Sequence, residues 1–362
     1  MYIITLGSED EKKLGILLNV PYLMLFFYVF LSKDILSALK NKISIIFICL
    51  LIIFGYLISY LYSENTNFAP LFFFIFPLLY ARLAPIHINS KDIKILHILF
   101  WCIMLYNVKN FKVSVLTTHF FNGNNFGLIV VICGIFLVLL TPLKKNYHRL
   151  YFLLILAYVF PALIASDSRN CIVIFCVFVL AKLVSFKIIK SKFYIITNLL
   201  LTFGSFLYVT LYIQLFKSNI SFEQFFSFLN SDKVFFSGRQ YIWDEGLSIL
   251  SNNIWGLGTH YNLTSFETNE LHNFVLELFV THGIIVGSLI LILLNIIIFP
   301  LLKNIDDSFI RNCVFAYFAF LFLNFNETFL LSHNICLLPL YLAYSRQREL
   351  YKNSTNLNIS CL

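Results

Sequence analysis

Long apolar runs alternate with short polar breaks along almost the whole chain, and this alternation is its dominant pattern. Runs near 18 residues recur, and each can cross a hydrocarbon layer about 30 Å thick. The pattern predicts eleven membrane-spanning helices, with ten or twelve as alternatives, at 14–31, 43–62, 68–81, 95–108, 126–142, 150–165, 170–186, 193–216, 273–300, 309–325 and 330–344. Pro77, Gly283 and Gly287 can break or pair the segments that contain them.

The composition agrees with a membrane protein. Hydrophobic residues make up 59% of the 362 and charged residues only 12%, whereas soluble domains average about 25% charged. We therefore predict an all-α polytopic protein in which residues 1–362 form a single transmembrane domain. Seven of the eight cysteines lie within or at the ends of apolar segments, and without a CxxC pair the sequence predicts neither a disulfide framework nor a zinc site.

The basic residues indicate the orientation. The net charge is +8, but no run of five Lys or Arg occurs, so nucleic acid is not an expected partner. Alternate loops carry 17 of the 26 Lys and Arg, and the loops between them carry 8. Because cytoplasmic loops are enriched in Lys and Arg, we predict that the richer set faces the cytoplasm, with the N-terminus outside and the C-terminus inside. The tail 351–362 is predicted to be disordered.

One long polar interruption, the outer loop 217–272, is where we expect function. It holds Ser237-Gly238-Arg239, then Trp255-Gly256-Leu257-Gly258, and it ends at His272-Asn273. The turns 166–170 and 325–333 are predicted to share its face. A fixed cation, a glycine turn and an imidazole are therefore all predicted to lie at the same membrane boundary.

Arginine is suited to hold a diphosphate, because its planar fork donates two parallel hydrogen bonds and keeps its charge. Ser237 and Gly238 allow a tight turn beside Arg239. Arg169 follows Asp167 at another outer turn and is a second candidate. Each arginine has a structural alternative. Arg169 can snorkel or pair with Asp167, and the carboxylates that could instead pair with Arg239 are Asp232, Asp244 and Glu245.

His272 is our candidate general base, because histidine titrates near neutral pH and can take a proton from a sugar hydroxyl. The alternative is an interfacial histidine that caps the helix or bonds a carbonyl. Asn273 is a cap or an orienting partner. Glu277 could orient His272 or pack protonated against a neighbour, and Glu327 could contact sugar or be solvated. Other outer candidates are the histidines His260, His282 and His333 and the aromatic residues Trp243, Trp255, Tyr241 and Tyr261, which could stack on sugars or form an interfacial belt.

Together these motifs resemble bacterial O-antigen and capsular polysaccharide polymerases, of the Wzy type, and the related O-antigen ligases. The resemblance lies in Ser168-Arg169, Ser237-Gly238-Arg239 with Trp243, Gly256-Leu257-Gly258, and His272-Asn273 leading to Gly283 and Gly287. It covers about 166–290, while the first 160 residues match only as a string of spans. Asn170 and Cys171 depart from the small residue that often follows the Ser-Arg pair.

The resemblance implies a metal-independent, inverting membrane glycosyltransferase of the C-type architecture, without a cofactor, in the bacterial inner membrane. Arg169 and Arg239 would hold the undecaprenyl diphosphate of a lipid-linked oligosaccharide at the outer face, and His272 would activate the acceptor. The implied partners are that oligosaccharide, membrane lipid and a chain-length regulator.

Two other functions compete. A ligase that moves finished glycan onto lipid A core shares the motifs. A polysaccharide or lipid flippase would also be polytopic, but coupled transporters tend to carry ionisable residues near the midplane and to show repeated halves. Within the predicted spans, Lys182 and Glu277 are nearly the only charges, and no halves repeat. The enzyme is therefore favoured over the transporter.

Overall fold

The computed structural model describes residues 43–62, 75, 78–79, 82, 88–117, 123–143, 145–184, 191–217, 239–258, 261, 263, 271–328 and 334–360. Within these ranges the secondary structure is helical, with no strand. The elements are α4 (Ile43–Tyr62), α6 (Ser90–Thr117), α7 (Gly123–Leu140), α8 (Asn146–Ala165), α9 (Arg169–Val184), α10 (Ser191–Lys217), α12 (Arg239–Asn252), α13 (Phe274–His282), α14 (Ile284–Leu302), α15 (Ser308–Leu323), η1 (Asn334–Leu337) and α17 (Leu338–Ser360).

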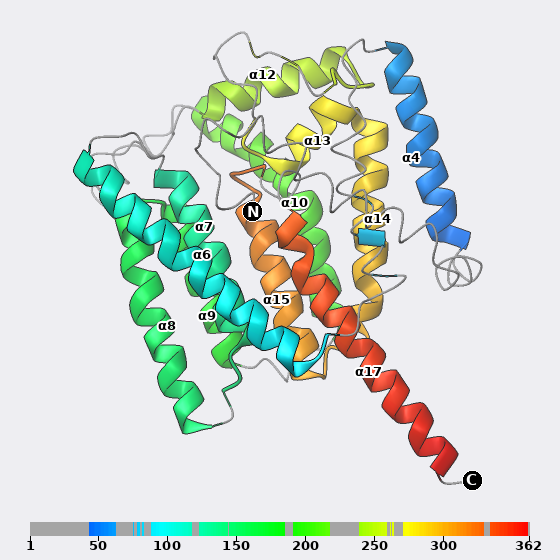
Figure 1. The fold of residues 1–362 in the computed structure, drawn as a ribbon. Coiled ribbons are helices and arrows are strands. Elements are labelled where there is room, and N and C mark those ends of the chain that lie inside the picture. The colour runs from blue at the N-terminus through cyan, green and yellow to red at the C-terminus, as the bar shows by residue number, and fades with distance from the viewer. Residues whose placement is uncertain are drawn as a thin grey trace.

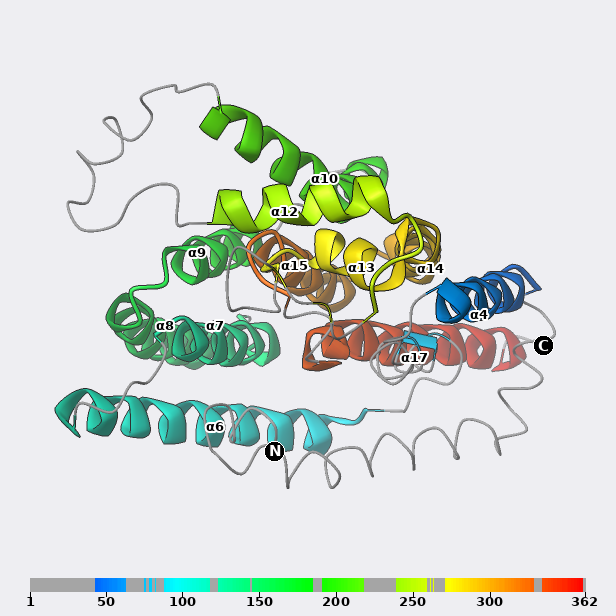
Figure 2. The ribbon, with the colours of Figure 1, turned by 90° about the horizontal axis from the view of Figure 1, so that it is seen from above.

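The long helices run up and down between two ends of a bundle, and α12 lies across one of those ends (Figure 1). Seen from that end, the helices form layers (Figure 2). Helix α10 packs on α14 and α15, which with α9 make the central layer, and α7, α8 and α17 lie behind them. Helix α6 covers α7 on the far side, and α4 packs on α14.

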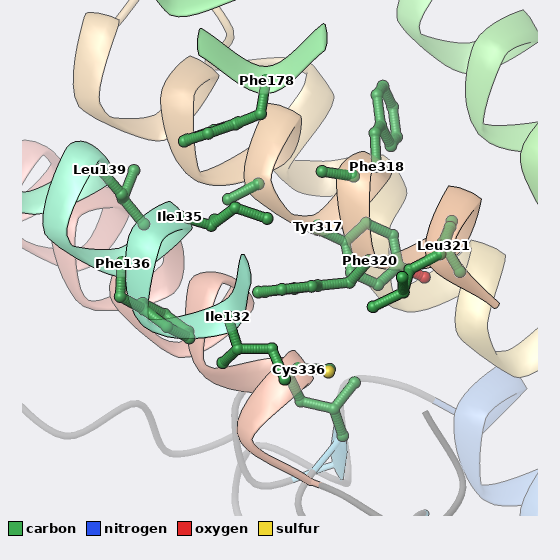
Figure 3. Close-up of a cluster of buried hydrophobic side chains, with 14 of the residues drawn as sticks. Ile132, Ile135, Phe136, Leu139, Phe178, Tyr317, Phe318, Phe320, Leu321 and Cys336 are labelled. Carbon is green, nitrogen blue, oxygen red and sulfur yellow. The ribbon is translucent and has the colours of Figure 1, made fainter. Parts of the chain in front are cut away.

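The centre of the bundle is aromatic and aliphatic. Side chains from α7, α9 and α15 meet there, including Phe136, Phe178 and Phe320 (Figure 3). The rings of Phe136 and Phe320 lie 5.7 Å apart, in the range of favourable aromatic pairs. Because α7 is buried along nearly its whole length, it needs no polar face, and its sequence is apolar all round.

Helix α10 is built with its apolar side facing outward. Ile196, Leu200 and Leu207 are exposed, whereas Asn198, Thr202 and Ser205 are at most 2% exposed on the opposite side. A soluble surface helix has the reverse pattern. This arrangement suits a helix that has lipid on its outer side and protein partners on its inner side. One such partner is Asn295 of α14, whose side-chain oxygen accepts a hydrogen bond from Asn198.

Three of the described helices are long and apolar enough to cross a membrane, within α8, α10 and α14: Asn146–Ala165, Lys192–Leu215 and Ile284–Leu302. Two more apolar helices, Asn124–Leu140 and Ser308–Leu323, are shorter. The all-helical fold is thus confirmed, while eleven membrane spans stay a prediction. The predicted span 14–31 and most of 68–81 lie outside the described residues.

Two details differ from the predicted elements, and a third, the break at Gly283, is one of the two alternatives that the sequence left open. The segment 273–300 is broken at Gly283, whose φ of 83° ends α13 and begins α14. The outer loop contains a helix, α12, because Trp243 and its buried neighbours give that stretch an apolar face. The predicted disordered tail was wrong for 351–360, which continues α17.

The lysine inside a predicted span has a structural explanation. The ammonium group of Lys182, on α9, donates hydrogen bonds to the carbonyls of Val138 and Thr141, the latter at 2.6 Å. These carbonyls belong to the C-terminal end of α7, where backbone acceptors lack helical partners and the dipole favours a cation. Lys182 therefore caps the C-terminal end of α7, which explains a charged side chain inside this segment.

Candidate functional site

Three chain segments that are distant in sequence meet at the end of the bundle crossed by α12. Arg239 is the first residue of α12, and His272 lies two residues before the start of α13. Glu327 follows the turn that ends α15. The site is therefore built from helix ends and turns, held by the long helices beneath.

Glu327 joins the two predicted residues Arg239 and His272. Its Oε1 accepts a hydrogen bond from Nη2 of Arg239 at 3.1 Å, and its Oε2 lies 3.5 Å from Nδ1 of His272. The side chains of Arg239, His272 and Glu327 are 21%, 32% and 18% exposed, so all three are partly buried and partly open to solvent. Each carboxylate oxygen faces a different cationic or potentially cationic group.

Asn273 fixes the geometry of this group. It is fully buried, and its side-chain oxygen accepts from the amide of Leu276, which makes it the predicted N-cap of α13. Its amide nitrogen donates to Oγ of Ser205 and to the carbonyl of Phe325, both at 2.9 Å. One side chain thus connects α10, α13 and the turn that carries Glu327. The backbone amide of Phe274 adds a 3.0 Å bond to the carbonyl of Asn324.

The backbone at His272 has an unusual conformation. Its φ is +50°, in the left-handed region, which is uncommon for residues other than glycine. The hydrogen bonds of Asn273 and Phe274 on its C-terminal side hold this conformation in place. A strained residue that aims an imidazole at a carboxylate is typical of a functional site. The cap of α13 is Asn273, so the interpretation of His272 as the helix cap was wrong.

Glu277 supports the segment before His272 through its backbone. Its carboxylate accepts from the amide of Leu271 at 2.9 Å, from the hydroxyl of Tyr261 at 2.7 Å and from Oγ1 of Thr281 at 3.2 Å. These bonds explain how a carboxylate persists in an apolar helix. Glu277 holds the residue that precedes His272 in the chain.

Buried aromatic residues pack around the helix that begins at Arg239. Trp243 is fully buried and donates from its indole to the carbonyl of Leu271 at 2.6 Å, so it cannot stack on a sugar. Tyr261 is also buried. Tyr208 of α10 contacts Trp243, donates to Asn326 at 3.2 Å and lies close enough to Arg239 to feel its charge. Among the predicted stacking residues, Tyr241 is the exposed one, at 52%.

Arg169 lies at the start of α9, which packs against α15. The next residue, Asn170, donates weakly to the carbonyl of Leu323 at 3.5 Å. The backbone of Arg169 is therefore close to the C-terminal end of α15. Its side chain is exposed, and within the described ranges no hydrogen bond or ion pair joins it to Arg239, His272 or Glu327.

The glycine turn supports the other end of α13. The amides of Leu257 and Gly258 donate to the carbonyls of Val280 and Thr281 at 2.8 and 3.0 Å. A Cβ at Gly256 would lie 2.5 Å from the nitrogen of Gly283, so the two glycines must pack directly together. Asn273 and Gly283 are separated by roughly 15 Å of helix. Gly256 and Gly258 thus position α13 and have no place beside the arginine and histidine.

The structure changes several interpretations of single residues. Arg239 pairs with Glu327, and the alternative carboxylates Asp244 and Glu245 are not its partners among the contacts described. Ser237, Gly238, Asp232 and His260 lie outside the described residues. Glu327 was treated as solvated or sugar-contacting, and its bridging position was not predicted. The available signal was an acidic residue in an outer turn of a chain with only 18 Asp and Glu.

Comparisons with known proteins give no identification: no family model, no curated protein and no solved structure matches this chain.

Proposed function

We propose that this protein is a polysaccharide polymerase that transfers an undecaprenyl-diphosphate-linked glycan onto a lipid-linked repeat unit at the outer face of a bacterial cytoplasmic membrane. The observation that carries the proposal is the group Arg239, Glu327 and His272. Arg239 supplies a cation that can bind an anion, and His272 supplies a general base. Both lie against the carboxylate of Glu327. A glycosyl transfer from a diphosphate carrier requires both.

The arginines at this end of the bundle favour an anionic substrate. One carboxylate faces the guanidinium of Arg239 and the imidazole of His272, and Arg169 at the start of α9 has a second, exposed guanidinium. The first helical residues of α9 and α12 are these two arginines, so the positive ends of two helix dipoles also point to this end of the bundle. Backbone amides at such ends and arginine forks both bind phosphate.

The residues can divide the reaction between them. Nε2 or Nδ1 of His272 takes the proton of the acceptor hydroxyl, whose oxygen attacks the anomeric carbon from the face opposite the diphosphate. The bond from that carbon to the diphosphate oxygen breaks, and its electron pair leaves with the carrier. Arg239 stabilises the negative charge that develops on the leaving diphosphate. Stabilisation of developing charge by fixed donors is usually the largest single contribution to catalysis. Arg169, at the start of α9, binds the same diphosphate in this proposal.

The two ends of the bundle fit the proposed orientation. The short connection 303–307 and the stretches that hold Lys145, Arg149 and Lys192 lie at the end away from α12. These belong to the loops that the positive-inside rule assigns to the cytoplasm. The group around Glu327 would then face outward, where lipid-linked repeat units are joined.

Glycolipid gels from a strain that lacks this protein test the proposal against the ligase. Loss of a polymerase leaves a core that carries a single repeat unit. Loss of a ligase leaves the core bare and the polymer on its carrier. Long chains that remain attached to the core in the deletion strain would contradict both functions.

Arg239→Lys tests the mode of diphosphate binding. Lysine keeps the charge but loses the planar pair of donors. We expect chain formation in a complemented strain to fall at least about tenfold, while the protein still reaches the membrane. Full activity of the lysine variant would contradict a two-pronged contact and would leave only a point charge at this position.

A further inference from the structure

We infer that Glu327 is an internal counter-ion that the diphosphate of the donor displaces from Arg239, and that it then serves as the positioning residue of His272. The inference rests on the proposed function and adds a step of regulation to it. Oε1 of Glu327 accepts from Nη2 of Arg239 at 3.1 Å. A diphosphate that contacts both Nη groups of Arg239 competes for this same Nη2, because a bidentate contact uses two adjacent donors of the guanidinium.

The exchange is favourable because a diphosphate carries more negative charge than one carboxylate. It also makes bidentate contacts that Glu327 does not make, since Oε1 accepts from Nη2 alone at this arginine. The pair is partly exposed, and ion pairs of this kind contribute little to stability. A diphosphate can therefore replace Glu327 at Arg239.

The second half of the inference concerns His272. Its Nδ1 lies 3.5 Å from Oε2 of Glu327, slightly beyond a normal hydrogen bond. Once Arg239 turns to the diphosphate, the carboxylate is left with His272 as its remaining contact in the group. A carboxylate on one imidazole nitrogen fixes the ring and the tautomer, so that the other nitrogen can accept a proton. Donor binding would therefore prepare the base.

The surroundings of His272 restrict the effect to Glu327. Glu277 is engaged by Leu271, Tyr261 and Thr281. The phenol of Tyr208 donates to Asn326. Arg239, on α12, is the cation that Glu327 contacts beside the imidazole. Among the groups described around the imidazole, the carboxylate of Glu327 is therefore the one placed to change partner.

The test is Glu327→Gln in the full-length protein purified in detergent, with inorganic pyrophosphate as the probe in titration calorimetry at low salt. We expect the variant to bind pyrophosphate about fivefold more tightly than the unmodified protein, because the competing carboxylate is gone. In a complemented strain the same variant should form polymer at least about tenfold more slowly, because His272 has lost its partner. A purely structural defect would weaken both properties together.

The matched control is Glu349→Gln, which removes a carboxylate from Arg346 at the opposite end of the bundle and should change neither measurement. Pyrophosphate binding that stays equal or becomes weaker in Glu327→Gln would overturn the displacement. Unchanged polymer formation in that variant would overturn the positioning of His272. Absence of binding in both the unmodified protein and Glu327→Gln would remove the diphosphate site itself, and with it the proposed function.

Discussion

The two ends of the bundle each carry an arginine paired with carboxylate, yet the two groups differ in their balance of charge. At the end crossed by α12, one carboxylate, Glu327, faces Arg239 and His272. At the opposite end, Arg346 faces two carboxylates, Asp307 at 3.3 Å and Glu349 at 3.1 Å. The first group has one carboxylate for an arginine and a histidine, and the second has two carboxylates for one arginine.

Each group also adjoins a helix N-cap. Asp307 caps α15 by accepting from the amides of Phe309 and Ile310, so its pair with Arg346 anchors α17 to the start of α15. Asn273 caps α13 and orients the chain beside His272. Similar ion pairs therefore have different roles at the two ends of the bundle. The group around Arg346 is saturated and fastens helices, while the group around Arg239 has donors left for a ligand.

The largest effect should come from removing the arginine or the histidine at the end crossed by α12. Arg239→Ala should abolish polymer, a loss of about 100-fold or more, because the diphosphate loses its principal cation. His272→Ala should do the same, since a general base contributes roughly 10²–10⁴-fold. Arg346→Ala is the matched control and should keep polymer of normal length. Glycolipid gels, together with immunoblots of isolated membranes, measure both chain length and the amount of protein.

This comparison would fail in either of two ways. Normal chain lengths in Arg239→Ala and His272→Ala would show that the group around Glu327 has no part in synthesis. Loss of polymer in Arg346→Ala, with the protein present at its usual level, would place function at the end we regard as structural.

The next effect separates the glycine turn from the site. Gly256→Ala should destabilise the protein by about 3 kcal/mol or more, because the new Cβ would lie 2.5 Å from the nitrogen of Gly283 in a left-handed backbone conformation. Gly204→Ala is the matched control. No atom lies within 4 Å of its new Cβ in α10, so it should stabilise the helix by up to about 1 kcal/mol.

Thermal unfolding in detergent measures both glycine variants. If Gly256→Ala unfolds at the temperature of the unmodified protein and loses only activity, the turn belongs to the reaction site after all.

The helix spans could be predicted from the sequence because they depend on local runs of apolar residues. Helices α8, α9 and α10 are observed at 146–165, 169–184 and 191–217, and these boundaries lie within a few residues of the predicted ones. The break at Gly283 was foreseen as one of two alternatives. Helix α12 was not predicted, because its buried face needs Leu271 and Leu276 as partners, and these lie about 30 residues further along the chain.

The candidate site was predictable in part for the same reason. Arg239 and His272 were identified by residue type and by their position at a predicted boundary, and the structure brings them together. Glu327 is 88 residues from Arg239, and nothing in the local pattern connects the two. Pairing between distant turns depends on how α13 and α15 pack, which residue spacing does not reveal. Joint contact of both arginines with one ligand stays a prediction.

A smaller effect compares the two caps. Asn273→Ala and Asp307→Ala should each cost about 1–3 kcal/mol in stability, since each removes a cap and leaves buried or half-buried donors and acceptors without a partner. Asn273→Ala should also lower polymer formation, because Ser205 and the carbonyl of Phe325 no longer fix the turn that carries Glu327. Asp307→Ala should leave polymer formation normal at permissive temperature. Unfolding temperatures and glycolipid gels on the same pair of variants decide whether the two caps differ in this way.

The smallest effect is expected at the saturated end. Glu349→Gln removes one of two carboxylates from Arg346, in a half-exposed pair three residues apart on α17. Such pairs contribute about 0.2–0.5 kcal/mol, and Asp307 remains to hold the arginine. The unfolding temperature in detergent should therefore fall by no more than a degree or two. A much larger fall would mean that Arg346 needs both carboxylates. The excess of negative groups at that end would then be a structural requirement, and the contrast with the single carboxylate at Arg239 would be stronger.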